Sequence, residues 1–129
     1  MKASLVYFVI VGTAAAAVHL CVVWLLVALC AWPAIAANPV GFLVAFAVSF
    51  GGHARWTFPL QRHLHRRAVR RFFVLAATGF VLNQMAFEWG LQRVGTQFYL
   101  TVLLAVMLGV AALTFVLGKA WAFAPEAVR

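Results

Sequence analysis

Two short segments of the chain combine a cation with aromatic rings, and they are almost copies of each other. Each segment has a Lys or Arg followed by a Trp-x-Phe pair: Arg55, Trp56 and Phe58 in the first, Lys119, Trp121 and Phe123 in the second. Guanidinium and ammonium groups bind phosphate oxygens, and Trp and Phe suit the headgroup layer of a membrane. Two interpretations stay open. The segments anchor helix ends at the membrane interface, or the cations bind a lipid phosphate in a groove shaped by the rings.

Between these segments lies a strongly basic stretch, "RHLHRRAVRRF". If this stretch is helical, its arginines fall on neighbouring turns and form a basic face along the membrane surface: Arg66, Arg67, Arg70 and Arg71. Arg70 and Arg71 join the two cations above as candidate phosphate ligands. The alternative is a signal for membrane orientation that binds anionic headgroups without specificity. His63 and His65 have no acid or cysteine nearby, so no metal site is predicted.

Polar side chains also occur inside apolar runs, at His19, Asn83, Gln84 and Glu88. Each costs a few kcal/mol inside a bilayer unless it is paired, so such residues are candidates for function. Gln84 and Glu88 are four residues apart, which predicts a hydrogen bond between them on one helix face. These residues either hold helices together by hydrogen bonds or line a polar seam, in which Glu88 or His19 takes up a proton.

The usual signatures of catalysis are missing from the sequence. It has no nucleophile–base pair, no glycine-rich phosphate loop before a helix and no paired carboxylates, so neither an enzyme nor a cofactor is predicted. Cys21 and Cys30 both lie in the first apolar run. They are expected to be buried small apolar residues and not a disulfide or a metal pair.

Composition identifies the class of protein that must position these residues. The chain of 129 residues is 67% hydrophobic and 9% charged, whereas soluble domains are about 45–50% apolar and about 25% charged. This predicts an integral membrane protein. The net charge of +8 then points to an anionic membrane surface as partner and not to nucleic acid.

Four apolar runs are long enough to cross a hydrocarbon core of about 30 Å as helices. They cover residues 5–31, 34–52, 72–91 and 98–118. The first run is too long for a cleavable signal peptide. The sequence therefore predicts an all-α integral membrane protein with four transmembrane helices.

The cations are distributed unequally over the two sides of such a protein. If the spans alternate, nine of the ten Lys and Arg residues fall on one side and only Arg93 falls on the other. Positive charge marks cytoplasmic segments. Both termini and the basic loop at 59–72 are therefore predicted to be cytoplasmic.

The chain also aligns with itself without a gap when residues 8–58 are placed over 73–123. The aligned pairs that carry weight are aromatic: Trp24 with Trp89, Phe50 with Phe115, Trp56 with Trp121, and Phe58 with Phe123. Each half has two spans, so both halves cross the membrane in the same sense. This predicts a single domain, 1–129, built from two parallel two-helix repeats, with a site at the interface between them.

The order of three motifs, "SFGGHARWTF", "RRFFVLAATGFVLN" and "LTFVLGKAWAF", resembles the GtrA-like family from about residue 7 to 123. The resemblance implies translocation of polyprenyl-phosphate-linked sugars across the bacterial cytoplasmic membrane, for modification of cell-surface polysaccharides. It assigns importance to both aromatic-and-basic segments and to Asn83, early in the third span. Where the family commonly has an acid in the first span, this chain has His19.

The resemblance also implies partners. These are a polyprenyl-phosphate-linked sugar and a glycosyltransferase, in addition to the anionic lipids that the net charge indicates. Because four spans enclose little volume, a second copy in a homo-oligomer is expected too. Two alternatives stay open. One is a membrane anchor or accessory subunit that transports nothing. The other is a small multidrug-type proton-coupled exporter, which the absence of a first-span acid disfavours.

Overall fold

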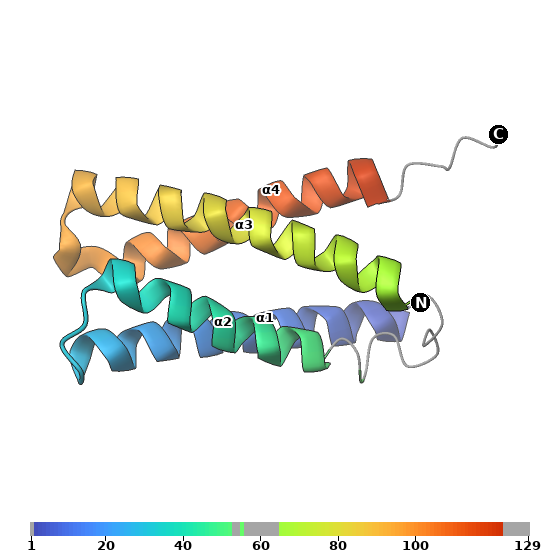
Figure 1. Cartoon of the computed structure of the whole chain (residues 1–129), viewed down its shortest axis with the longest axis horizontal. Helices are drawn as coiled ribbons and strands as arrows, with labels where there is room; N and C mark the ends of the chain where they lie inside the picture. Colours follow the sequence, from blue (N-terminus) through green and yellow to red (C-terminus); the bar gives the residue numbers. More distant parts are fainter. Residues whose placement is uncertain (1, 53–54, 56–64, 123–129) are drawn as a thin grey trace.

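The computed structural model describes residues 2–52, 55 and 65–122, and these residues form a bundle of long helices. The elements are α1 (Lys2–Ala28), α2 (Ala34–Gly52), α3 (His65–Val94), the 3₁₀ turn η2 (Thr96–Phe98) and α4 (Tyr99–Ala122). They lie side by side along one long axis (Figure 1). We call the end where α1 and α3 begin and α2 and α4 end the basic end. The opposite end, with the connections 29–33 and 95–98, is the turn end.

Each of the two connections at the turn end contains one residue with a positive φ. After α1, Ala31 has a φ of 55°, and the Trp32 N–H donates to the Leu26 carbonyl at 3.0 Å. After α3, Gly95 has a φ of 102°, a conformation that glycine adopts without a Cβ clash. Its N–H donates to the Leu91 carbonyl at 2.9 Å. Both connections reverse the chain within a few residues, which makes α1–α2 and α3–α4 two hairpins.

By length and composition, three helices can cross a membrane: Val6–Ala28 in α1, Ala34–Gly52 in α2, and Thr96–Thr114 in η2 and α4. Among the described residues α3 does not reach the same apolarity, because Asn83, Gln84 and Glu88 interrupt it and its first turns are basic. The all-helical architecture predicted from the sequence is therefore confirmed, with three helices that are long and apolar enough to cross a membrane. A membrane crossing by α3 stays a prediction.

Helix boundaries agree with the sequence prediction in α2 and differ in α3. The predicted span 34–52 matches α2 at both ends. The helix α3, by contrast, begins at His65, so residues 65–72 are helical and the loop predicted at 59–72 was placed too far along the chain. This stretch contains no Gly or Pro and has four Arg residues, which favour helix. With 30 residues, α3 is about 45 Å long and exceeds the hydrocarbon core.

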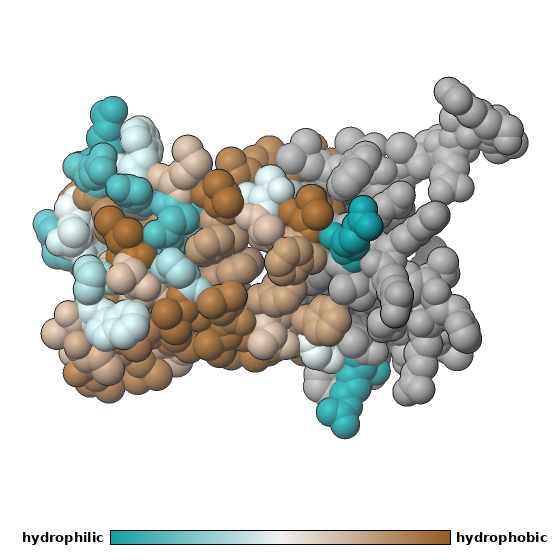
Figure 2. All heavy atoms as spheres, viewed as in Figure 1, coloured by the Kyte–Doolittle hydropathy of each residue, from teal (hydrophilic) through white to brown (hydrophobic). Residues whose placement is uncertain are grey.

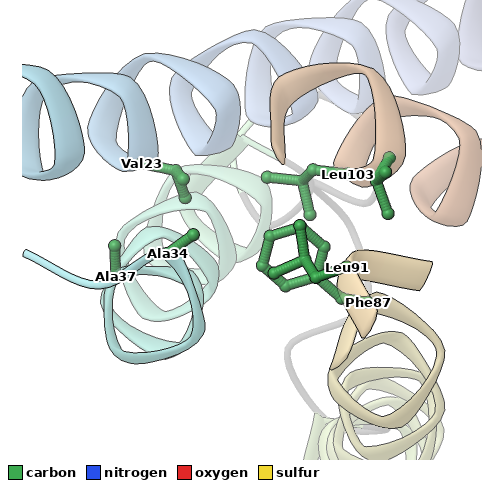
Figure 3. Close-up of a cluster of buried hydrophobic side chains, with 7 residues drawn as sticks. Val23, Ala34, Ala37, Phe87, Leu91 and Leu103 are labelled. Atoms are coloured by element: carbon green, nitrogen blue, oxygen red, sulfur yellow. The ribbon is translucent and has the colours of Figure 1, made fainter. Parts of the chain in front are cut away.

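All four helices contribute to an apolar core near the turn end (Figure 3). Its buried members are Val23 of α1, Ala34 and Ala37 of α2, Phe87 and Leu91 of α3, and Val102 and Leu103 of α4. Val23, Phe87 and Leu103 are completely buried. This core fixes the hairpins against each other close to the polar residues described below.

The two helices of the first hairpin pack closely along a face of small residues. The buried face of α2 is made of small residues apart from one: Ala34, Ala37, Asn38, Gly41, Ala45 and Gly52. A Cβ at Gly41 would lie 2.8 Å from His19 Cδ2, and a Cβ at Gly52 would lie 2.8 Å from Val11 Cγ1. Small residues therefore let α1 and α2 approach closely, as in membrane helix pairs generally.

The outer surface is apolar over the middle of the bundle, and hydrophilic residues gather at the turn end (Figure 2). Large apolar side chains are exposed on every helix, among them Ile10, Leu43, Met85 and Leu108. Cys21 and Cys30 are also exposed and free, so the expectation that they are buried was wrong. An apolar exterior of this kind suits lipid as solvent.

Candidate functional site

A single buried asparagine, Asn38, lies at the centre of the polar residues inside the bundle. Its side chain is completely buried on α2. The Asn38 amide nitrogen donates to Asn83 Oδ1 and to Gln84 Oε1, both at 2.8 Å, and Asn38 Oδ1 lies 2.7 Å from His19 Nε2. These bonds join three helices, α1, α2 and α3. We call these four residues the Asn38 cluster.

The Asn38 cluster ends on a backbone carbonyl that Pro39 leaves without its usual partner. In a helix the Ile35 carbonyl accepts from the N–H four residues on, and Pro39 has no N–H. Gln84 Nε2 donates to this carbonyl at 2.9 Å instead. A side chain of α3 thus satisfies a backbone group of α2, which is how prolines are tolerated in membrane helices.

This carbonyl also fixes the direction of every hydrogen bond in the cluster. The Ile35 oxygen is only an acceptor, so Gln84 must turn its NH₂ toward it and its oxygen toward Asn38. Asn38 then turns its own NH₂ to Gln84 and its oxygen to His19. The proton between His19 and Asn38 must therefore be on His19 Nε2, and His19 donates it.

His19 is held in place by close neighbours as well as by its hydrogen bond. Its side chain is buried on α1, and the Phe42 ring of α2 lies nearly perpendicular to the imidazole, with 6.4 Å between the ring centres. Gly41 supplies the space, since any Cβ there would overlap the imidazole. Among the described residues, no buried side-chain nitrogen or oxygen lacks a hydrogen-bond partner.

Three members of the Asn38 cluster, His19, Asn83 and Gln84, were candidates from the sequence, and the structure brings them together. Asn38 itself was missed. The pair "NP" at 38–39 is typical of a turn or a helix start, so an asparagine there attracts no attention. The proline four residues after Ile35 signals the position of the cluster, because a free carbonyl inside an apolar helix requires a polar partner; that partner is Gln84, which also bonds to Asn38.

Glu88 lies apart from the Asn38 cluster. It is exposed on α3, and the hydrogen bond predicted between it and Gln84 is absent, because Gln84 bonds to Asn38 and to the Ile35 carbonyl. Gln84, Glu88 and the exposed Gln92 follow one another at intervals of four residues. They therefore form a polar stripe on α3 that leads from the cluster toward the turn end.

A ladder of aromatic rings occupies the other half of the α2–α3 seam. On α2, Phe42, Phe46 and Phe50 have ring centres 6.2 Å apart at each step, with interplanar angles of 28° and 18°. From α3, Phe80 lies 4.5 Å from Phe42, and Phe73 meets Phe46 edge-on at 6.1 Å. We call these five residues the phenylalanine ladder; the sequence prediction did not include it.

The candidate phosphate ligands all lie toward the basic end. Arg55 follows the end of α2 and Arg70 lies in the second turn of α3, and both are exposed. The backbone carries Arg71 within α3 and Lys119 and Trp121 within the last turns of α4, at the same end of the bundle (Figure 1). The predicted aromatics Trp56, Phe58 and Phe123 lie outside the described residues.

The opposite end carries a different arrangement. Arg93 lies near the end of α3 and places its guanidinium 5.0 Å from the centre of the Trp89 ring, within the range of a cation–π contact.

Within the part of the chain that the structure describes, no three His, Cys, Asp or Glu side chains gather as a metal site would require.

Comparison with known proteins identifies the family. The family model described as GtrA/DPMS, transmembrane domain, matches residues 7–123. No curated protein and no solved structure matches the chain. The match covers all four helices, the Asn38 cluster and both cation-and-aromatic segments. The chain therefore belongs to the GtrA/DPMS transmembrane-domain family, to which its sequence motifs already pointed.

Proposed function

We propose that this protein translocates a polyprenyl-phosphate-linked sugar across the bacterial cytoplasmic membrane, for modification of cell-surface polysaccharides. The observation that carries the proposal is the Asn38 cluster, a set of amides and an imidazole inside an otherwise apolar bundle. Amide groups exchange hydrogen bonds with sugar hydroxyls, which need such partners in a lipid environment. Family membership supports the same function.

The proposed topology has four spans with both termini in the cytoplasm. A crossing by α3 is supported by its packing against α2 and α4 and by the bonds of Asn83 and Gln84 to Asn38, which lower the cost of placing their amides in lipid. The orientation is supported by the excess of cations at the basic end. Two parallel repeats then meet at the α2–α3 seam.

At the cytoplasmic face the phosphate docks on Arg55 and Lys119, with Arg70 and Arg71 raising the local concentration of anionic lipid. Trp56, Phe58, Trp121 and Phe123 border the headgroup there. The sugar then moves along the α2–α3 seam past the Asn38 cluster, while the polyprenyl chain stays in the bilayer. A second copy of the chain encloses the seam, and a glycosyltransferase supplies the lipid-linked sugar.

A non-transporting anchor or accessory subunit for a cell-envelope glycosyltransferase is the second candidate. It is favoured by the completeness of the Asn38 cluster, whose bonds tie three helices together without any ligand. The exporter alternative rests on Glu88 as a proton carrier. Loss of transport in Glu88→Gln, together with export of a cationic drug, would favour it.

Transport by purified protein in liposomes tests the proposal. A short-chain polyprenyl-phosphate-linked sugar is added outside, and its uptake is measured for wild type, Arg55→Gln, Lys119→Gln and the control Arg93→Gln. We expect uptake by wild type, a loss of about tenfold or more for each basic-end variant, because a charge-assisted bond to phosphate is removed, and little change for Arg93→Gln. A wild type that moves no lipid-linked sugar, together with normal glycosyltransferase binding, supports the accessory subunit instead.

A further inference from the structure

We propose that the phenylalanine ladder is a carbohydrate-binding track, on which the sugar ring stacks while it moves between the cations of the basic end and the Asn38 cluster. This inference rests on the proposed function and goes beyond it, since it assigns a binding surface to residues with no role so far. The ligand class is a pyranose or furanose headgroup whose C–H face packs on the rings.

The ladder has a regular geometry along α2. Successive rings of Phe42, Phe46 and Phe50 are nearly parallel and evenly spaced at 6.2 Å. Even spacing of like groups offers neighbouring positions of similar affinity, so that a ligand passes from one to the next without a deep trap. Each step along α2 is four residues, which rise by about 6 Å in a helix.

The ladder is accessible where a headgroup would enter. Phe50 is 38% exposed and Phe73 is 58% exposed, and both lie toward the basic end. Phe42 and Phe80 are half-buried deeper in the bundle, where their rings meet at 4.5 Å. The exposed surface of the rings therefore decreases from the basic end toward the Asn38 cluster.

The order of residue types is the same on the two helices that face each other. From the turn end to the basic end, α2 presents Asn38 and then the three rings, and Arg55 follows its end in the sequence. Over the same length α3 presents Gln84, then Phe80 and Phe73, then Arg70. The two helices run in opposite directions (Figure 1). Because the order of residue types is nevertheless the same from end to end of the bundle, the amides of one helix lie level with those of the other, the rings lie level with the rings, and the cations lie at the basic end.

This combination fits a glycosylated phosphate better than a plain lipid. A cation binds the phosphate, and amides hydrogen-bond hydroxyl groups. Aromatic rings offer a flat apolar surface, and sites for amphipathic ligands generally combine such surfaces with a few polar groups. An acyl or polyprenyl chain alone needs neither the cation nor the amide. The sugar is therefore the occupant that uses all three.

Binding measurements on purified protein in lipid nanodiscs test the track. The probes are polyprenyl phosphate linked to glucose, mannose or arabinose, and the same polyprenyl phosphate without a sugar. The variants are the double substitution Phe42→Leu/Phe46→Leu, which keeps apolar volume and removes the rings, and Phe42→Tyr/Phe46→Tyr, which keeps them. Phe98→Leu, at an exposed ring in η2 at the turn end, is the matched control.

We expect wild type to prefer at least one sugar-linked lipid over the sugarless one. The double Leu variant should lose about tenfold of that preference, which corresponds to two aromatic contacts, whereas the Tyr and Phe98→Leu variants keep it. Equal loss for sugar-linked and sugarless lipid, or full preference in the double Leu variant, overturns the track. Transport separates the two ideas: wild-type uptake with an unaffected double Leu variant leaves the proposed function standing and removes the track.

Discussion

Each of the two hairpins of this protein consists of two long helices, but one aligned buried position holds a polar residue in the first hairpin and an apolar residue in the second. When residues 8–58 are aligned with 73–123, Asn38 of α2 corresponds to Leu103 of α4, and both side chains are completely buried. Leu103 joins the apolar core, whereas Asn38 bonds to side chains of α1 and α3. The comparison shows that the buried amide at the centre of the Asn38 cluster comes from the first hairpin, although two of its partners, Asn83 and Gln84, lie on α3.

The buried faces of α1 and α3 differ in rotation as well. Three buried residues of α1 have buried counterparts on α3 at positions 64 residues later. The α1 residues are Ala15, His19 and Val23, and the α3 residues are Gly79, Asn83 and Phe87. The sequence alignment has an offset of 65, and one residue turns a helix by about 100°. This rotation explains why Glu88 is exposed although Val23, with which it aligns, is completely buried.

Replacing Asn38 with the residue of the other hairpin is expected to have the largest effect. Asn38→Leu leaves the His19 N–H, Asn83 Oδ1 and Gln84 Oε1 without their partner. We expect a loss of about 2–4 kcal/mol in the free energy of unfolding, since several buried polar groups become unpaired at once. Titration with a denaturing detergent measures this loss.

The matched control is Gln92→Leu, which removes an exposed amide on α3. It should change stability by less than about 0.5 kcal/mol. If Asn38→Leu is as stable as wild type, Asn38 is not the centre that distinguishes the two hairpins, and the buried position tolerates either residue type.

Much of the fold follows from the sequence because apolar length is a local property. The span predicted at 34–52 coincides with α2, since Pro33 and the glycines at 51–52 mark its limits in the sequence. The start of α3 was missed by several residues, because a basic segment is compatible with a loop or with a helix that extends beyond the membrane. Only the backbone at His65 decides between them.

The site was less predictable, because it depends on the rotation of one helix against another. His19, Asn83 and Gln84 could be selected as polar residues in apolar runs, but nothing local showed that they meet at Asn38. The phenylalanine ladder resembles any apolar face until Phe80 and Phe73 of α3 are placed beside it. Such contacts between distant segments are set by packing and not by composition.

Small residues at the hairpin interfaces provide the next comparison, with an intermediate effect. At Gly41 an added Cβ would meet His19 Cδ2 and Val23 Cγ2 at 2.8 Å and the His19 carbonyl oxygen at 3.1 Å. At Gly90, in the second hairpin, it would meet Val102 Cγ1 at 2.6 Å and no other group closer than 3.9 Å. The His19 backbone beside Gly41 can move aside less easily than the single Val102 methyl group beside Gly90.

We therefore expect Gly41→Ala to lower the free energy of unfolding by about 1–3 kcal/mol and Gly90→Ala to lower it less. Gly12→Ala is the control, because nothing lies within 4 Å of a Cβ there; it should be neutral or slightly stabilising, since Ala favours helix over Gly. Detergent-induced unfolding of the three variants ranks them. A greater loss at Gly90 would mean that the second hairpin is the more tightly packed one.

The smallest effect concerns the backbone carbonyl that Pro39 leaves free, a feature that α4 lacks because Leu104 stands at the aligned position. Gln84→Leu removes the donor to the Ile35 carbonyl and one acceptor of Asn38, and we expect it to cost about 1 kcal/mol. In a Pro39→Ala background the restored N–H of residue 39 satisfies the same carbonyl. The cost of Gln84→Leu should then fall by about 0.5 kcal/mol or more.

A double-mutant cycle on the free energy of unfolding measures this difference. The lost Asn38 bond is common to both backgrounds, so it cancels, and the coupling reports on the carbonyl alone. Equal costs in the two backgrounds would show that the bond to Ile35 contributes nothing, and that Gln84 stabilises the bundle only through Asn38.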